Sequence, residues 1–171
     1  MTRRSLIVDG YNVLRSTPRY WPHAKRDLES ARARLVADVA AFAKGGDWDA
    51  HVVFDGALNP DSTGAAHEIA GIQVVFSAYG RDADSAIEDM ASRCGSAGRD
   101  VTVVTSDAET QWVVMGQGAT RMSSAEFASE LGEAEVDWRA ANPSGSKNVT
   151  LDRLLDDTTR LALSRWARGE R

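Results

Sequence analysis

Leu6-Ile7-Val8-Asp9-Gly10 is a short apolar run that ends in an acidic residue, and this arrangement decides the fold. An apolar run closed by Asp-Gly predicts a buried strand followed by a turn. His51-Val52-Val53-Phe54 repeats the arrangement and ends in Asp55-Gly56. Two more β-rich runs cover 72–76 and 101–104. We therefore expect four main strands, with a short fifth near 119–122.

Helical patterns separate these strands. Apolar residues recur three and four positions apart over 25–44, and Gly45-Gly46 follows as a helix stop. Further helices are expected over 82–93, 107–115, 124–131 and 151–166. Residues 11–24 are expected to be irregular, and 59–71 to form a mobile loop. Strands that alternate with helices predict an α/β fold, with a central parallel sheet and helices on both faces.

The length of 171 residues fits one domain. We expect this domain over 1–140, with 141–171 as a linker and a C-terminal helix that packs on the same domain or on a partner. A single cysteine, Cys94, excludes an intramolecular disulfide. The first residues lack the apolar stretch of an export signal, and no apolar run is long enough for a membrane span. We expect a cytoplasmic protein with no membrane partner, and the oligomeric state stays open.

The net charge of −5 is unevenly distributed. Residues 1–34 contain eight basic and three acidic residues, whereas the remainder contains 12 basic and 22 acidic residues. An acidic average argues against a protein that coats duplex nucleic acid, but it permits a local basic patch beside an acidic site.

Acidic residues follow the predicted strands, and parallel sheets bind ligands at the carboxyl ends of their strands. Asp9, Asp55 and Asp107 each come at or just after a strand end, and Asp84 and Glu88 share one helix face. Gathered carboxylates favour a hard cation such as Mg²⁺ or Mn²⁺, which activates water for attack on a phosphodiester. The alternative is structural, because aspartates are common in turns and at helix starts, where Asp82 also lies.

The opening block Leu6-Ile7-Val8-Asp9-Gly10-Tyr11-Asn12-Val13 resembles that of YacP-like NYN-domain proteins, a branch of the PIN-like nucleases. Four further blocks match in the same order, so that the resemblance covers about 5–131. They are Val53-Phe54-Asp55, Ala83-Asp84-Ser85-Ala86-Ile87-Glu88, Val104-Thr105-Ser106-Asp107 and Gly118-Ala119-Thr120-Arg121-Met122-Ser123 leading to Glu126-Phe127. The resemblance implies a PIN-like (NYN) fold and metal-dependent cleavage of single-stranded RNA.

By matching position, the resemblance implies that Asp9, Asp84 and Asp107 are the metal-site acids. It also implies that Asn12 positions an acid, a metal-bound water or a phosphate. Asp55, Asp82 and Glu88 are further candidate ligands. Two departures are the charged pair Arg81-Asp82 and Ala86, where an uncharged residue and a tyrosine are expected. An added carboxylate alters metal number or affinity, and a lost aromatic ring alters base stacking.

A basic segment with interleaved aromatic residues follows Asp9. Cations bind the phosphates of single-stranded RNA, and aromatic rings stack on its bases. The predicted RNA-binding residues are Tyr11, Arg15, Arg19, Tyr20, Trp21, Lys25, Arg26 and, beside Asp107, Ser106. The alternative is an ordinary solvated segment. We expect the tryptophans Trp48, Trp112, Trp138 and Trp166 to be core or interface residues.

The sequence therefore predicts a metal-dependent endoribonuclease whose partner is single-stranded RNA, with messenger RNA and ribosome-associated RNA as candidates. Three alternatives remain open. An RNA-binding module without catalysis would bind RNA but not cleave it. A phosphohydrolase would act on small phosphate esters and ignore oligonucleotides. A structural partner domain would tolerate Asp→Asn changes at every strand end.

Overall fold

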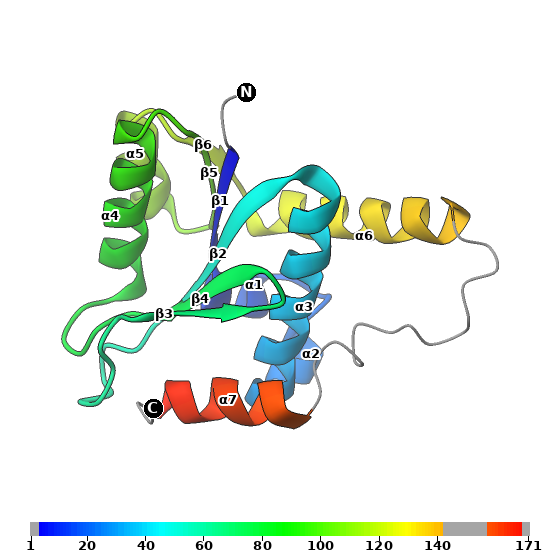
Figure 1. The fold of residues 1–171 in the computed structure, drawn as a ribbon, viewed down its shortest axis with the longest axis horizontal. Coiled ribbons are helices and arrows are strands. Elements are labelled where there is room, and N and C mark those ends of the chain that lie inside the picture. Colours follow the sequence, from blue (N-terminus) through cyan, green and yellow to red (C-terminus); the bar gives the residue numbers. More distant parts are fainter. Residues whose placement is uncertain (1–3, 142–156, 169–171) are drawn as a thin grey trace.

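A six-stranded sheet runs through the middle of the molecule with helices on both faces (Figure 1). The computed structural model describes residues 4–141 and 157–168. The strands are β1 (Arg4–Asp9), β2 (Trp48–Phe54), β3 (Ala66–Ile69), β4 (Ile72–Phe76), β5 (Asp100–Val104) and β6 (Thr120–Met122). Their order is β3-β4-β2-β1-β5-β6, and β3 alone runs antiparallel to its neighbour. The predicted α/β architecture with a central parallel sheet is confirmed, and the antiparallel strand β3 extends this sheet at one edge.

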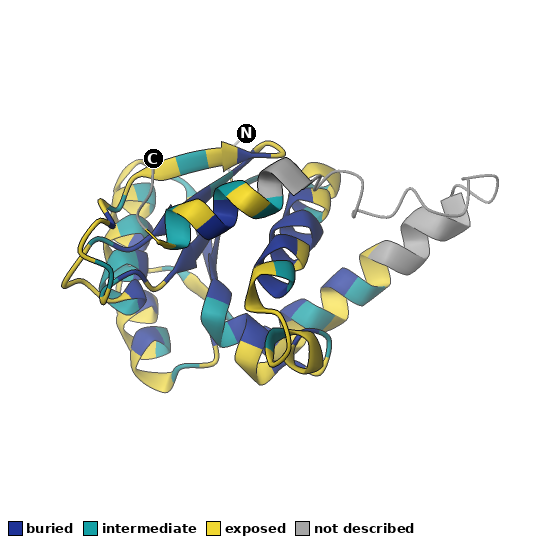
Figure 2. Cartoon of the chain, turned by 90° about the horizontal axis from the view of Figure 1, so that it is seen from below, coloured by how far each residue is buried: buried dark blue, intermediate teal, exposed yellow. Residues whose placement is uncertain are grey.

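The helices divide into two layers according to which face of the sheet they cover. They are α1 (Gly10–Ser16), α2 (Trp21–Ala24), α3 (Leu28–Gly46), α4 (Ala83–Ser96), α5 (Ala108–Gly116), α6 (Ser124–Ala141) and α7 (Asp157–Ala167). Ile7 of β1 packs with Ile87 of α4 and Val114 of α5 in one apolar cluster. Its neighbours Leu6 and Val8 point the other way and join the cluster of α1, α3, α6 and α7. Figure 2 shows that the buried residues follow the sheet and the helix faces turned toward it.

The sheet edge next to β4 is formed by a hairpin that the sequence did not predict. Residues 59–71 were expected to form a loop, but 66–69 are β3 and pair with β4. Ala70 and Gly71, with φ of 52° and 84°, make the connection. Only Ile69 of β3 is buried. An edge strand with so little burial lacks the apolar alternation by which strands are recognised.

The segment 11–24, expected to be irregular, contains the short helices α1 and α2 with a turn at 17–20 between them. Asp9 begins α1, because its carboxylate accepts a hydrogen bond from the Asn12 backbone N–H at 3.1 Å. A helix of seven residues is too short to show an apolar period. The following helix, expected from 25, begins at Leu28 with Asp27 as its N-cap, and α6 extends ten residues beyond the expected 131, to Ala141. The predicted start of the last helix, 151–156, lies outside the described residues.

Gly10 is required because α1 starts against an aromatic ring. A Cβ at this position would lie 2.3 Å from the Phe54 ring, which is fully buried. We expect Gly10→Ala to lower the free energy of unfolding by about 1–3 kcal/mol, since the core must shift to accept the methyl group. Urea unfolding tests this, with Gly45→Ala as the control. Gly45 has open space around its Cβ position, so that change should be neutral or slightly stabilising. Equal effects at both glycines would contradict the prediction.

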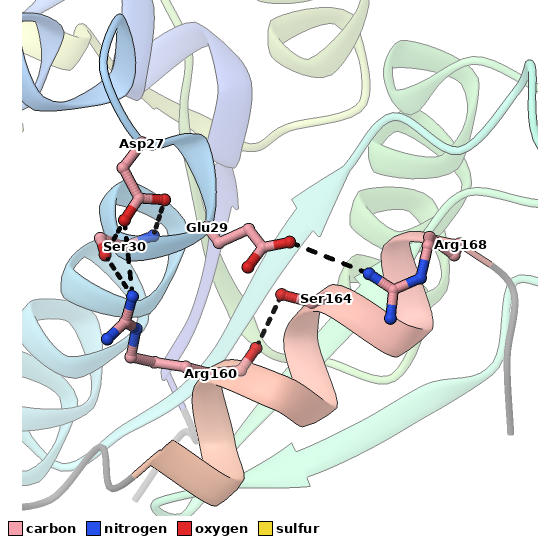
Figure 3. Close-up of polar contacts among 6 residues, drawn as sticks. All are labelled: Asp27, Glu29, Ser30, Arg160, Ser164 and Arg168. Carbon is pink, nitrogen blue, oxygen red and sulfur yellow. Dashed lines mark hydrogen bonds and ion pairs between the residues drawn. The ribbon is translucent and has the colours of Figure 1, made fainter.

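The helix α7 packs against α3, and polar contacts join the two (Figure 3). The Arg160 guanidinium donates to the Ser30 hydroxyl at 2.8 Å, and Arg168 lies 3.9 Å from a Glu29 oxygen. On the other side, the Trp166 ring stacks on His67 of β3 with their centroids 4.0 Å apart. The helix therefore bridges α3 and the hairpin edge of the sheet. No helix in the described part of the chain combines the length and apolar character needed to cross a bilayer.

Candidate functional site

The carboxyl ends of β1 and β5 lie side by side and bring two aspartates together. Asp9 is the last residue of β1, and Asp107 follows β5 and caps α5. Asp84 comes from the first turn of α4, a helix that contacts β1, β5 and α5. The three acids therefore lie together at the carboxyl ends of the strands. Two follow neighbouring parallel strands, and the third comes from the helix that packs against these strands.

Two threonine hydroxyls connect these three carboxylates. Thr105 donates to Asp9 Oδ2 at 3.3 Å, and its oxygen accepts the backbone N–H of Asp107 at 3.1 Å. The Thr110 hydroxyl oxygen lies 2.8 Å from Asp84 Oδ1 and 3.2 Å from Asp107 Oδ1. Both threonines are buried, whereas Asp84 and Asp107 are half-buried. The two hydroxyls hold the acids in one hydrogen-bonded group.

Two carboxyl groups at this edge, Asp9 and Glu88, have raised pKa values. Burial above all, and then the charges of Asp84 and Asp107, raise the pKa of Asp9 from 3.8 to about 6, although hydrogen bonds from Asn12 and Thr105 oppose the rise. The pKa of Glu88 is also raised, by burial and by the neighbouring Asp84, Asp82 and Asp89 carboxylates. A buried carboxyl group with a raised pKa beside other carboxylates, as at Asp9, is typical of functional sites.

Asn12 joins three segments around the acids. Its side-chain oxygen accepts the Ser106 backbone N–H at 2.8 Å and the Ser124 hydroxyl at 2.7 Å. Ser106 in turn accepts the backbone N–H of Ser124 through its hydroxyl at 3.1 Å. The starts of α1 and α6 are thereby fixed to the turn after β5. Asn12 thus positions the frame of the acid site, and its contact with a water or a phosphate stays a prediction.

Thr105, Thr110 and Ser124 were not identified from the sequence. Their hydroxyls act on side chains that are distant in the chain, up to 112 residues for Ser124 and Asn12. The one local signal was at Thr110, which follows the helix cap Asp107 by three residues and donates its backbone N–H to that carboxylate at 3.0 Å. That signal indicates a helix start and says nothing of the contact with Asp84.

The three further candidate ligands lie around this group in different ways. Asp55 is exposed, and its carboxylate accepts the Ala57 backbone N–H at 2.8 Å, so it closes the turn after β2. Asp82 caps α4 through the Ser85 N–H at 2.8 Å, and hydrogen bonds from Ser85 lower its pKa. Glu88 faces the same side as Asp84, as its spacing predicted. Asp55 and Asp82 therefore have the local structural roles that the sequence offered as alternatives.

The two departures from the family pattern, Arg81-Asp82 and Ala86, have local roles at the start of α4. Arg81 forms an ion pair with Asp89, and Asp82 caps the helix. Ala86 packs against the apolar cluster that the sheet forms with α4 and α5.

The donor set of the site fits a hard cation. Among residues 4–141 and 157–168, no three His, Cys, Asp or Glu side chains form a group that holds a metal ion by direct ligation. Mg²⁺ needs fewer, because it typically binds one or two protein carboxylates and keeps several waters. The oxygen-only donors and the raised pKa of Asp9 suit a cation bound in this way.

The predicted RNA-binding segment divides into exposed and buried residues. Tyr20 is fully buried, and its hydroxyl donates to Asp38 at 2.6 Å, so its ring is closed to bases and that prediction is wrong. Arg19 is engaged with the same Asp38 at 3.0 Å. Tyr11 is half-buried against Phe54. The exposed members are Arg15, Trp21, Lys25, Arg26 and Ser106.

The tryptophans also differ in how far they are buried. Trp48 and Trp166 pack at the margin of the core, as predicted. Trp112 is 75% exposed, so it is no core residue. The side chain of Trp138 lies outside the described residues.

Comparison with known proteins places the chain among relatives of similar length. It is 27% identical over 176 residues to the uncharacterized protein YacP of Bacillus subtilis (strain 168), a match that covers 96% of this chain and 97% of the relative. Two crystal structures of Rae1 (YacP) from Bacillus subtilis are 28% identical to it, each with a TM-score of 0.68. One, a tryptophan-to-leucine mutant, covers 94% of this chain and 98% of its own, and the other 96% and 94%. The model of the YacP-like NYN domain matches residues 6–168, and the chain therefore belongs to the YacP-like NYN-domain family, with its PIN-like fold.

Proposed function

We propose that this protein is a divalent-metal-dependent endoribonuclease that cleaves single-stranded RNA. The observation that carries the proposal is the joined group of Asp9, Asp84 and Asp107 at the carboxyl ends of the strands. Burial, and then the charges of Asp84 and Asp107, raise the pKa of Asp9, so an ionised Asp9 is a cost to the fold. Because the chain belongs to a nuclease-like family, we attribute this cost to the function of the acid group.

The residues of this chain have separate tasks in the proposed reaction. One or two of the carboxylates of Asp9, Asp84 and Asp107 would bind the cation directly, and the rest would contact its waters. Thr105 and Thr110 would orient the carboxylate oxygens. A bound Mg²⁺ or Mn²⁺ supplies Lewis acidity and an activated water for attack on the phosphodiester. The exposed cations Arg15, Lys25 and Arg26 attract the phosphates of the RNA strand, and Lys25 also lies 4.6 Å from the ring centre of the exposed Trp21.

The test is cleavage of an end-labelled, unstructured oligoribonucleotide. We expect cleavage with Mg²⁺ or Mn²⁺, none with a chelator, and a loss of roughly a hundredfold in Asp84→Asn. Asp100→Asn is the matched control, because it neutralises an exposed carboxylate at the opposite end of β5.

Three results would contradict the proposal. Salt-dependent RNA binding without cleavage under either metal would favour a binding module. Hydrolysis of small phosphate esters with oligonucleotides left intact would favour a phosphohydrolase. Full RNA cleavage by Asp84→Asn would show that the acid group has no part in the reaction. The cellular RNA, including messenger and ribosome-associated RNA, and a cytoplasmic site of action stay predictions.

A further inference from the structure

A small pocket with an exposed aromatic wall lies on α5, the helix that begins at Asp107. It has a volume of about 200 Å³ and is lined by Gln111, Trp112, Met115 and Arg121. Trp112 is 75% exposed and Met115 46% exposed. Large apolar side chains so open to water are typical of binding surfaces.

Hydrogen bonds connect this pocket to the acid site. The Arg121 guanidinium donates to Gln111 Oε1 at 3.0 Å, and the Gln111 amide donates to the Thr105 carbonyl at 2.6 Å. Thr105 is the residue whose hydroxyl contacts Asp9. The helical rise puts Trp112 only about 7.5 Å along the axis from Asp107. Pocket and acids therefore share one rigid frame.

The chemistry of the pocket suits a nucleotide. The Trp112 face offers a stacking surface for a base of any kind. Arg121 supplies a cation for a phosphate. Hydrogen bonds from Ser123 above all, and also the charge of Arg121, lower the pKa of the nearby Glu126 carboxyl, which does not line the pocket. No acidic side chain lines the pocket. A protein contact would use the apolar rim as well, but it would not need a guanidinium beside the aromatic ring.

We propose that this pocket is a base-binding subsite, in which one nucleobase of single-stranded RNA stacks on Trp112 and an adjoining phosphate contacts Arg121. This inference rests on the proposed function and adds a second contact to it. The exposed cations of 15–26 lie on the opposite helical layer, beyond Asp9. An RNA strand held at both places passes over the acids, which fixes which phosphate is cleaved.

The test is the affinity for a fluorescent, unstructured oligoribonucleotide, measured by anisotropy in chelator so that cleavage does not interfere. Trp112→Ala should weaken binding roughly five- to a hundredfold, whereas Trp112→Phe keeps most of the affinity. Arg121→Gln should reduce the slope of log affinity against log salt by about 0.7. The controls are Leu161→Ala, an exposed apolar residue on α7, and Arg4→Gln, an exposed cation at the amino end of β1.

The outcomes separate this inference from the proposed function. If the unmodified protein binds and cleaves RNA, and Trp112→Ala binds as tightly as Leu161→Ala, the subsite is wrong and the nuclease proposal stands. If the unmodified protein binds no RNA even at low salt, both are wrong. If Trp112→Ala leaves RNA affinity unchanged but alters self-association in sedimentation, the pocket is a protein contact, which also overturns the subsite.

Discussion

Asp9→Asn is expected to stabilise the fold above pH 6 by up to about 3 kcal/mol in metal-free buffer, and to abolish RNA cleavage. The stabilising effect arises because Asp9 is 7% exposed and has a pKa of about 6 against an ordinary 3.8. Asparagine keeps an oxygen that can accept the hydrogen bond from the Asn12 backbone N–H, and its amide NH2, in place of Oδ2, can donate to the Thr105 hydroxyl oxygen. It removes the buried charge that burial, Asp84 and Asp107 disfavour.

The direction of the pH effect follows from proton binding. Between pH 3.8 and about 6 the folded protein holds a proton on Asp9 that the unfolded chain has lost. The contribution of Asp9 to stability therefore falls as the pH rises through this window, and stays at its lower level above pH 6. Asp9→Asn lacks this dependence, so the two proteins should differ most above pH 6 and converge toward pH 4.

Urea unfolding from pH 4 to 8 in chelator measures this difference, with Asp100→Asn as the exposed control. Adding Mg²⁺ or Mn²⁺ at pH 7.5 should then raise the unfolding midpoint of the unmodified protein but not that of Asp9→Asn, because a ligand of the folded state stabilises it. If Asp9→Asn is less stable than the unmodified protein at pH 7.5, the main role of Asp9 is to cap α1, and the prediction is contradicted.

Leu163→Ala is expected to lower the free energy of unfolding by about 2–5 kcal/mol. Leu163 is fully buried and belongs to the main apolar cluster, together with Leu35 and Val39 of α3. Its truncation leaves a cavity between α7 and α3 that the polar contacts at Ser30 and Glu29 cannot fill. Exposed ion pairs of this kind contribute little.

The matched control is Leu161→Ala, two residues earlier on the same helix and 62% exposed. It has the same change in composition and helix propensity but no buried contact, so we expect an effect within about 0.5 kcal/mol. Urea unfolding followed by tryptophan fluorescence also reports on Trp166, which stacks on His67. Equal losses for the two variants would mean that α7 contributes no buried apolar surface.

The sequence predicted the sheet well because buried strands leave short apolar runs that end abruptly. Asp9 and Asp107 illustrate how its two interpretations of the acids combine. Asp107 caps a helix, as the structural alternative held, and Asp9 caps one where that alternative expected a turn. Both also belong to the acid group that the functional interpretation expected at the strand ends. The same strand-to-helix turn makes the cap and places the carboxylate beside the other acids.

What the sequence missed depends on distant contacts. Thr110 meets Asp84 across 26 residues, and no local pattern encodes that distance. Tyr20 lies in a segment whose composition is typical of RNA binding, but its ring is buried and its hydroxyl bonds to Asp38 of α3. Trp112 is the opposite case. It was expected to be a core or interface residue, because an aromatic residue in an apolar helix is usually buried, but it is exposed. In each case tertiary placement decides between two roles that the residue type allows.

The two outer strands have a consequence for how copies of the molecule behave toward each other. β3 has four residues and β6 only three, and each presents a charged side chain, Glu68 or Arg121. Short, charged border strands offer a neighbouring chain few free backbone groups to pair with. The sheet thus resists growth into a continuous intermolecular ladder, and a crowded solution should be less prone to form aggregates through these borders.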